Sequence, residues 1–495
     1  MISPPSGAEA LVLDDEGRRV EPATEDDWQA WVAASRTRHF IDGDPILDWL
    51  DRFGEARGFV PDTALGGYDA RTDMRALILE RGRAFEDGVV ALIRERLEAV
   101  HVGQGWEDAR DLGAAQRTVE AMRAGVPVIE QAVLRDPSRR TYGSVDLLVR
   151  SDVLDAIVPG TLEPDDTATG APGLGSIGWH YRVVDIKFRT LDLDSSGGAG
   201  SGQRAYMAQV WVYNAALGRI QGYTPPASYL LGRSWKDSQD RGGGCFERLA
   251  RVDQVRLFRD GTSLEGIVEE GLAWVRRLRT EGHEWQVLPR PSVMELYPHM
   301  RHGMDAPWHT AKAAIAAELG ELTVLPAMNP ERRRDAHRRG IVRWDDPAVS
   351  AKTLGISTPS HAAKCDAVLA VNRPATPPVL PERLTAAHPA WRKPARLETY
   401  VDFETVSNIN DDFSRLPRVG GQALIFQIGC GHWEDDGRWA FRQWTVERLR
   451  EPDEVAAISS WVEYLEGLRH ERGLEWDDVR IVHWAPAETA SLTRA

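Results

Sequence analysis

The hydrophobic residues of this chain follow two periods, one typical of helices and one typical of strands. In the stretch 72–100, apolar residues recur at spacings of three and four, which predicts the strongest helix of the chain, with Gly82 as a break or a bend. Shorter segments with the same period predict further helices over 25–54 and over most of 255–345. The helical period therefore marks three parts of the sequence.

Between the helical parts, runs of β-branched and aliphatic residues predict strands. T-Y-G-S-V-D-L-L-V-R, which starts at Thr141, and Y-R-V-V-D-I-K-F, which starts at Tyr181, are two such runs, and A-S-Y-L-L-G-R-S is a third. R-A-Y-M-A-Q-V-W-V-Y predicts a helix between the second and third strands. The order helix, strand, strand, helix, strand predicts a mixed α/β (α+β) core.

A second β-rich block follows a Pro-rich stretch that predicts an inter-domain linker. E-T-Y-V-D-F-E-T-V, Q-A-L-I-F-Q-I-G-C-G-H-W and R-W-A-F-R-Q-W-T-V predict three successive antiparallel strands, and a helix and one more strand follow. We expect five parts: a loose N-terminal segment (1–25), a first domain (26–290), a helical connecting region (291–373), the linker (374–396) and a second domain (397–495).

Composition narrows the chemistry. The 495 residues carry a net charge of −15, which argues against a surface coated with basic charge for non-specific binding of nucleic acid. Only six of the 60 basic residues are lysines, so a lysine inside a motif stands out, whereas the many arginines are a property of GC-rich coding. A local basic channel around an acidic site stays compatible with this charge.

The three cysteines are far apart and form no C-x-x-C pair, so disulfide frameworks, zinc ribbons and iron–sulfur clusters are not expected. A metal would be held by oxygen ligands, which points to Mg²⁺ or Mn²⁺. No apolar run is long enough to span a bilayer, and the N-terminus lacks the pattern of a secretory signal. We therefore expect a cytoplasmic protein, bacterial or phage-encoded, without a membrane partner.

The first candidate constellation lies in the two predicted strands. Asp185 and Lys187 project to one face of their strand because side chains alternate with period two. Asp146 lies in the preceding strand, and both acids stand among aliphatic residues, where an unpaired carboxylate would be costly. A divalent cation held by these acids, with a lysine nearby, is the arrangement that phosphodiester hydrolysis requires.

These motifs resemble the PD-(D/E)XK nuclease family in its RecB-like branch. That family has an acid on a first helix, then G-x-x-D, then (D/E)-x-K and then Q-x-x-x-Y, and the matching residues here are Glu86, Asp146, Asp185, Lys187, Gln209 and Tyr213. The resemblance implies a restriction-endonuclease-like core, with metal held by Glu86, Asp146 and Asp185. It also implies that Lys187 positions the attacking water, and that Gln209 and Tyr213 support the site or contact DNA.

Plainer interpretations of the same residues stay open. An Asp-x-Lys pair in a strand is more often part of a solvated face, and Tyr213 is equally compatible with a core aromatic. The helix 72–100 holds other acids besides Glu86. The ordered set of motifs, rather than any one of them, favours the catalytic interpretation.

The second constellation is Asp402 and Glu404, two residues apart on one strand face, with Glu488 downstream. A D-x-E pair on a first strand resembles an RNase H-like fold of the DEDD exonuclease type, in which four acids hold two metals. That pattern also needs a late acid on a C-terminal helix, and the sequence stops at Ala495 before one. We therefore expect a truncated RNase H-like domain that lacks a full metal site.

The combination of both domains resembles the group of RecB-family nucleases that carry a YprB-like, RNase H-like domain. In the connecting region, E-L-T-V-L-P followed by a basic helix resembles a helix-hairpin-helix element. Its candidate phosphate contacts are Arg332, Arg333, Arg334, Arg338 and Arg339, with a solvated basic helix as the alternative.

The sequence thus predicts a metal-dependent nuclease that acts on single- or double-stranded DNA. The resemblance implies exonuclease-like processing in DNA repair, recombination or phage replication. Two alternatives stay open, a non-catalytic nucleic-acid-binding scaffold and an RNA-directed nuclease. No G-x-x-x-x-G-K-[S/T] motif occurs, so a helicase or repair partner would be a separate chain.

Overall fold

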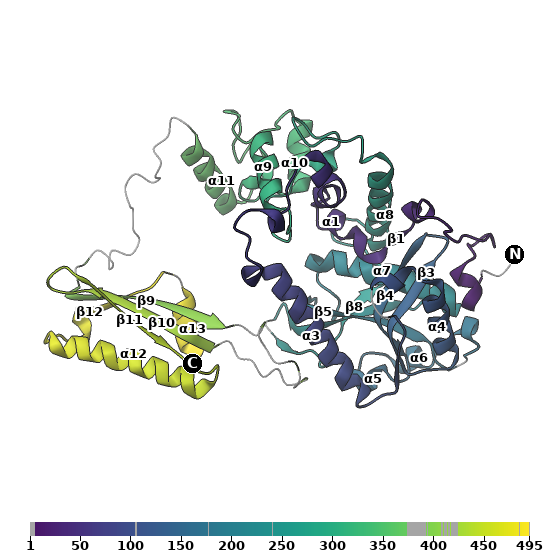
Figure 1. Cartoon of the computed structure of the whole chain (residues 1–495), viewed down its shortest axis with the longest axis horizontal. Helices are drawn as coiled ribbons and strands as arrows, with labels where there is room; N and C mark the ends of the chain where they lie inside the picture. The colour runs from purple at the N-terminus through teal and green to yellow at the C-terminus, as the bar shows by residue number, and fades with distance from the viewer. Residues whose placement is uncertain are drawn as a thin grey trace. The chain divides into compact units, whose positions relative to one another are not determined.

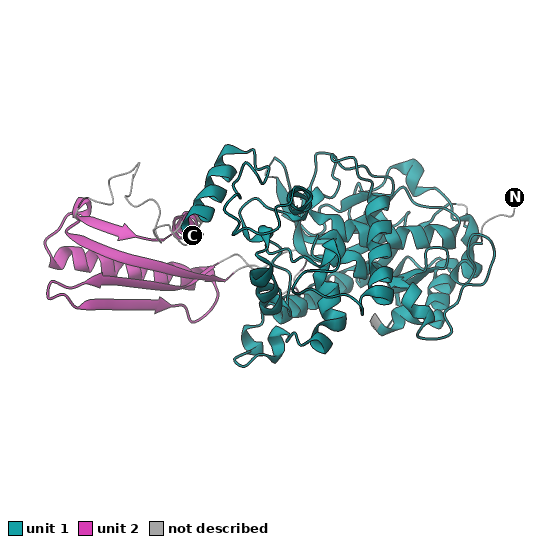
Figure 2. Cartoon of the chain, turned by 90° about the horizontal axis from the view of Figure 1, so that it is seen from above, with its two compact units in different colours: residues 1–380 teal, residues 381–495 magenta. Residues whose placement is uncertain are grey.

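The computed structural model describes residues 5–103, 106–176, 178–239, 241–373, 393, 395–406, 409, 413, 416, 424–484 and 486–494. The chain divides into two compact units, residues 1–380 and residues 381–495 (Figure 2). Both units combine helices with a sheet, which confirms the predicted mixed α/β class. The predicted linker 374–396 lies almost wholly outside the described residues.

An eight-stranded sheet forms the centre of the described part of unit 1 (Figure 1). Its strands are β1 (Val32–Ala33), β2 (Ala99–His101), β3 (Val128–Asp136), β4 (Thr141–Arg150), β5 (Tyr181–Leu193), β6 (Ala227–Asp237), β7 (Gly242–Gly244) and β8 (Ala250–Asp253). The main order is β2-β3-β4-β5-β6-β7, with β1 paired to β4 and β8 to β6. The central strands β3, β4 and β5 are antiparallel, whereas β6 runs parallel to β5.

Helices surround this sheet and extend the unit. They are α1 (Arg38–Ile41), α2 (Ile46–Trp49), α3 (Met74–Arg94), α4 (Leu112–Arg123), α5 (Leu154–Ile157), α6 (Pro164–Thr167), α7 (Arg204–Gln221), α8 (Leu264–Glu281), α9 (His309–Leu319), α10 (Pro330–Arg338) and α11 (Pro359–Asn372). Helix α7 packs on the sheet and is buried along most of its length. It ends at Gly222, whose φ of +68° suits glycine because a side chain is disfavoured there.

Helix α3 is the strong helix that the sequence predicts. The Asp73 side chain caps its first turn by accepting the backbone N–H of Ala76 at 3.0 Å. The helix continues through Gly82 without interruption, so the expected division there is wrong. Phe85 anchors it against β5 through the ring of Phe188, at 5.8 Å between ring centres.

One hydrophobic core reaches from the N-terminal segment to helix α9. Ala10 and Leu11, in a short 3-10 helix, are fully buried in it, so the prediction of a loose segment over 1–25 is wrong for this part. Part of the predicted connecting region, 291–319, packs into the same core. Helices α10 and α11 instead pack around a separate smaller cluster between Leu322 and Leu369.

Unit 2 contains a four-stranded sheet in the order β11-β10-β9-β12 among the described residues. Its elements are β9 (Leu397–Val406), β10 (Leu424–Trp433), β11 (Trp439–Thr445), α12 (Glu451–Glu471), β12 (Val479–Val482) and α13 (Pro486–Arg494). The first three strands are antiparallel, as predicted, and β12 runs parallel to β9. Helix α12 packs Trp461 and Leu465 against Val401 and Ile428. None of the helices in the described part of either unit combines the length and apolarity needed to cross a bilayer.

Candidate active site

Strands β4 and β5 place two carboxylates and a lysine side by side. Asp185 and Lys187 lie on the same face of β5, where Asp185 is 1% exposed and Lys187 Nζ forms an ion pair with Asp185 Oδ2. Asp146 extends from the neighbouring antiparallel strand, and its Oδ2 accepts the backbone N–H of Ile186 at 2.6 Å. The N–H of the residue between Asp185 and Lys187 therefore holds Asp146 at the motif.

Helix α3 brings Glu86 to the same place, and Gln131 of β3 joins it to Asp146. Gln131 Nε2 donates to Glu86 Oε1 at 2.7 Å and lies 3.5 Å from Asp146 Oδ1. The Ser144 hydroxyl donates to Gln131 Oε1 at 2.9 Å, which fixes the orientation of the amide. Four elements, α3, β3, β4 and β5, therefore supply this cluster.

The backbone at Gln131 is strained. Its φ is +46°, in the left-handed region that non-glycine residues rarely adopt. Gln131 lies opposite Asp146 in the β3–β4 ladder, between the paired residues Glu130 and Ala132. Strain of this kind persists where surrounding contacts determine the conformation, and here the contacts are those with Glu86, Ser144 and Asp146.

The charges of this cluster act on one another. Burial raises the pKa of Asp146 well above its ordinary value, and the negative charges of Asp185 and Glu86 raise it further. The pKa of Glu86 is also raised, first by burial and then by Asp185. Burial alone would lower the pKa of Lys187, but the charges of Asp185 and Asp146 raise it. The site thus concentrates negative charge that a single lysine does not neutralise.

The donor set fits a hard divalent cation. Asp185 Oδ1 is buried and has no hydrogen-bond donor, although an unpaired buried carboxylate oxygen is costly. Oxygen ligands from carboxylates are those that Mg²⁺ and Mn²⁺ prefer. Among the described residues, however, no three His, Cys, Asp or Glu side chains have the arrangement of a formed metal site. Instead, the Gln131 amide lies between Glu86 and Asp146, and the Lys187 ammonium pairs with Asp185.

Gln209 and Tyr213 contact each other one helical turn apart on α7, where Gln209 Nε2 donates to the Tyr213 hydroxyl at 3.2 Å. The Tyr213 ring lies directly on Gly143, because a Cβ there would stand 2.6 Å from Cε1 of the ring. Burial raises the pKa of Tyr213, and the charge of Asp185 adds to this effect. The glycine of the G-x-x-D motif therefore makes room for the tyrosine of the Q-x-x-x-Y motif.

Sequence reasoning missed Gln131, together with the strand β3 that carries it and the helix α4 before it. The run V-I-E-Q-A-V-L could have indicated this strand, because it is an apolar segment just before the turn that leads to β4. Two polar residues, Glu130 and Gln131, interrupt it. Alternation does not single out Gln131, because its neighbour Glu130 is polar as well, is buried and forms an ion pair with Arg94 of α3.

The second predicted constellation is dispersed. Asp402 and Glu404 lie on the exposed face of β9. Glu488 lies on α13, is 7% exposed and contacts His483 Nδ1 at 3.4 Å. Within the described residues, no hydrogen bond or ion pair links Glu488 to either residue of the strand pair.

The predicted arginine cluster has two different parts. Arg333 is 2% exposed, and its Nη1 donates to the carbonyl oxygens of Tyr297 and Pro298 and to Glu321. Its assignment as a phosphate contact is therefore wrong, since the guanidinium is used within the fold. The remaining members reach the surface fully or in part: Arg332, Arg334, Arg338 and Arg339.

Comparison of the chain with protein-family models, with curated proteins and with solved structures found no match. The functional interpretation therefore depends on the side chains described above and on what their chemistry permits.

Proposed function

We propose that the protein is a divalent-metal-dependent nuclease of the PD-(D/E)XK type, with a RecB-like core, that hydrolyses DNA phosphodiester bonds. The proposed site is formed by α3, β3, β4 and β5 of unit 1. Exonuclease-like processing of DNA in repair, recombination or phage replication is the role that the motif resemblance favours.

The observation that carries this proposal is that three carboxylates from separate elements lie near one half-buried lysine, two of them linked through the Gln131 amide and the third paired with the lysine. Glu86, Asp146 and Asp185 are far apart in sequence, yet the charge of Asp185 raises the pKa of both other carboxyls, and the charge of Glu86 raises that of Asp146. Bringing like charges together in a poorly solvated place costs free energy, and packing contacts do not offset this cost. A metal cation bound by these carboxylates would neutralise their charge and could in turn bind a phosphate group.

In the proposed site, Asp146, Asp185 and Glu86 would hold Mg²⁺ or Mn²⁺. When bound, such a cation supplies a Lewis acid for the phosphate and a more acidic water. Lys187 holds a positive charge beside Asp185, where it orients the attacking water and offsets the charge that develops on the phosphate oxygens. Gln131 fixes the positions of the Glu86 and Asp146 carboxylates relative to each other. Tyr213 packs against β4 at Gly143.

For unit 2, we propose an RNase H-like fold without a complete catalytic site. Three antiparallel strands, a helix and a strand parallel to the first support this fold. The exposed positions of Asp402 and Glu404 and the contact of Glu488 with His483 support an incomplete site. The chemistry is therefore assigned to unit 1.

The test is a cleavage assay with labelled single- and double-stranded DNA and RNA, in Mg²⁺, Mn²⁺ or EDTA. We expect cleavage of DNA with either metal and none in EDTA. Asp185→Asn, which keeps the side-chain volume, and Lys187→Ala should each lower the rate by about a hundredfold or more, because they remove a metal ligand and the neighbouring positive charge.

Lys236→Ala is the matched control, since Lys236 is an exposed lysine on the adjacent strand β6. Its rate should stay within about twofold of the wild type. Absence of cleavage in every metal, or cleavage that survives both site substitutions, would contradict the proposal. Equal cleavage of RNA would reassign the substrate.

A further inference from the structure

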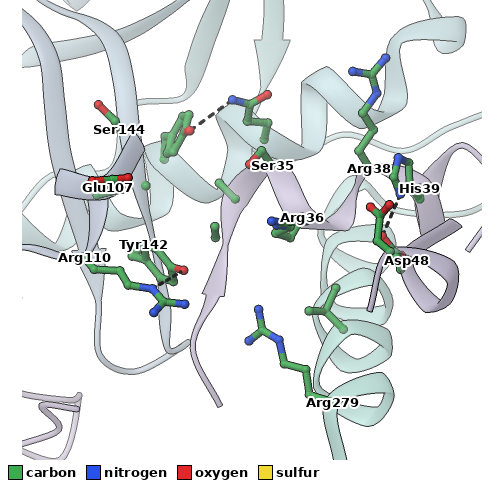
Figure 3. A pocket seen from close by; sticks show the side chains of 18 of the residues that line it. Ser35, Arg36, Arg38, His39, Asp48, Glu107, Arg110, Tyr142, Ser144 and Arg279 are labelled. Atoms are coloured by element: carbon green, nitrogen blue, oxygen red, sulfur yellow. Dashed lines mark hydrogen bonds and ion pairs between the residues drawn. The ribbon is translucent and has the colours of Figure 1, made fainter. Parts of the chain in front are cut away.

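A cavity of about 1180 Å³ opens beside the candidate site of unit 1 (Figure 3). One part of its wall is formed by residues of that site, namely Gln131, Gln209 and Tyr213. Other parts of the wall carry five arginines: Arg36, Arg38, Arg52, Arg110 and Arg279. In a chain whose net charge is −15, this is a local concentration of positive charge next to a cluster of carboxylates.

Three of these arginines point into a common space. Figure 3 shows Arg36, Arg110 and Arg279 around the middle of the cavity, each coming from a different element. They belong to the 3-10 helix Ala34–Thr37, the 3-10 helix Trp106–Arg110 and helix α8. The positive charges therefore meet from several walls rather than along one face.

Two of these three arginines have no carboxylate partner among the described residues. Arg36 is exposed and makes no hydrogen bond or ion pair with another described residue. Arg279 Nη1 donates to the carbonyl oxygens of Trp28, Gln29 and Trp31, and no carboxylate of the described chain pairs with it. The guanidinium of Arg279 is thus held in place by neutral groups, with its charge left uncompensated.

Two of the three acids of the cavity wall, Asp48 and Asp51, already accept hydrogen bonds within the fold, and the third, Glu107, is exposed. Asp48 accepts from His39 Nδ1 and from Trp274 Nε1, both at 2.9 Å. Asp51 accepts from Trp308 Nε1 at 2.6 Å. Burial, together with the charges of neighbouring arginines, lowers the pKa of Arg279 to about 10. An anion placed among these groups would relieve that repulsion.

Basic side chains extend from the cavity wall to the carboxylates of the candidate site. The guanidinium of Arg38, which lines the cavity, lies 5.4 Å from the centre of the Tyr206 ring. Lys187 Nζ and the Arg189 guanidinium lie 5.3 and 5.6 Å from the same ring. Tyr206 of α7 therefore has cations around it that connect the arginine wall to the lysine of the candidate site.

We propose that this arginine-lined cavity binds the phosphate backbone of a nucleic-acid single strand and leads it to the carboxylates of β4 and β5. The proposal rests on the nuclease function above and specifies its substrate as unpaired strand. A duplex carries its phosphates on the outside of a wide cylinder and is contacted on one side, whereas these arginines meet from several walls. A single strand can place its phosphates among them.

The experiment measures binding separately from cleavage. A fluorescein-labelled oligo(dT) strand and a labelled duplex of equal length are titrated with the full-length protein in EDTA, and anisotropy is followed over a range of salt. We expect the strand to bind about tenfold or more tightly than the duplex. The Arg36→Ala, Arg110→Ala double variant should weaken strand binding about tenfold and reduce the salt slope by about 0.7 for each phosphate that is no longer neutralised.

Arg259→Ala is the matched control, because Arg259 is an exposed arginine of unit 1 outside the cavity wall. It should leave both affinity and salt slope unchanged. Equal binding of strand and duplex, or an unchanged affinity of the double variant, overturns the proposal. So does displacement of the strand by inorganic phosphate where chloride of the same ionic strength does not displace it, since this would show a small-anion site.

Failure of this proposal is distinguishable from failure of the proposed function. Asp185→Asn should abolish cleavage and keep strand binding, because Asp185 lies outside the arginine wall. If cleavage depends on Asp185 but strand binding is unchanged in the Arg36→Ala, Arg110→Ala variant, only the proposed strand-binding cavity is overturned. Binding that depends on the arginines without any cleavage would instead overturn the nuclease function.

Discussion

At the scale of single residues, Gln131 is the most informative position. Its side chain contacts two candidate metal ligands and Ser144, and its backbone adopts a left-handed conformation in the middle of a strand. The ladder opposite Asp146 is interrupted at this residue. A strained residue that touches the carboxylates indicates that its amide, and not only its volume, is needed there.

Gln131→Gly tests this role, because glycine adopts a positive φ without strain and removes only the side chain. We expect the DNA cleavage rate to fall about tenfold or more, and the Mg²⁺ concentration that gives half the maximal rate to rise, since Glu86 and Asp146 lose their shared donor. The thermal midpoint should change little. A variant with unchanged metal dependence would show that the amide has no positioning role.

At the scale of elements, a buried ion cluster connects helix α9 to the turn between α1 and α2. Lys312 is fully buried, and its Nζ contacts Asp44 Oδ2 at 2.9 Å and Asp305 Oδ2 at 2.6 Å. It also donates to the carbonyl oxygens of His299 and His302. Two of the six lysines of the chain, Lys187 and Lys312, thus lie against buried carboxylates, one at the candidate site and one in the frame of the fold.

Lys312→Met is expected to lower the free energy of unfolding of unit 1 by about 3–5 kcal/mol, because it removes the lysine charge that the buried Asp44 and Asp305 share. Urea denaturation followed by circular dichroism measures this. Lys364→Met, at an exposed lysine of α11, should stay within about 0.5 kcal/mol of the wild type. Equal stability of the two variants would mean that the cluster is not a structural link.

At the scale of the whole molecule, the two units carry separate hydrophobic cores. The candidate site and the arginine-lined cavity both belong to unit 1. Unit 2 contributes a sheet whose acids lie on its exposed face and on α13. Although the chain carries a net charge of −15, five of its arginines line the cavity where a strand of phosphates would be bound.

The assignment of chemistry to unit 1 has a direct consequence for unit 2. The double variant Asp402→Asn, Glu404→Gln should cleave DNA at a rate within about twofold of the wild type. The reason is that exposed acids that do not form a complete metal site contribute little to the rate. Measured in the same assay, Asp185→Asn is the reference for an inactivated site. A double variant as inactive as Asp185→Asn would place the chemistry in unit 2.

Acid should destabilise unit 1 through a buried histidine. His180 is fully buried, its Nδ1 lies 2.8 Å from the carbonyl oxygen of Thr169, and burial, with the charge of Arg182, lowers its pKa to about 4. The unfolded chain binds the proton near pH 6.5, so stability is lost as pH falls from about 6.5 to 4. The loss from this residue amounts to about 3 kcal/mol.

Thermal midpoints measured from pH 7.5 to pH 4 follow this effect. His180→Gln should flatten the dependence in this window, because the amide does not titrate. An unaltered pH profile in the variant would assign the acid sensitivity to other groups, among them His299 and His337, whose pKa values are also lowered to about 4 by burial.

Much of the local structure follows from the sequence. The helical period of α3, the alternation of β4 and β5 and the antiparallel order of β9, β10 and β11 all depend on neighbours in the chain, so they can be predicted from patterns. The same holds for Asp185 and Lys187 on one strand face and for Gln209 and Tyr213 on one helix face. The short spacing in sequence fixes their direction.

Contacts between distant segments were decided only by the tertiary structure. Gln131 meets Glu86 across 45 residues, Lys312 meets Asp44 across 268, and arginines from separate elements meet in one cavity. Local patterns carry no information on these distances, because they depend on how the strands pair and how the helices pack. The sequence by itself determined the candidate ligands; the packing of β3, α3 and α8 decided what surrounds them.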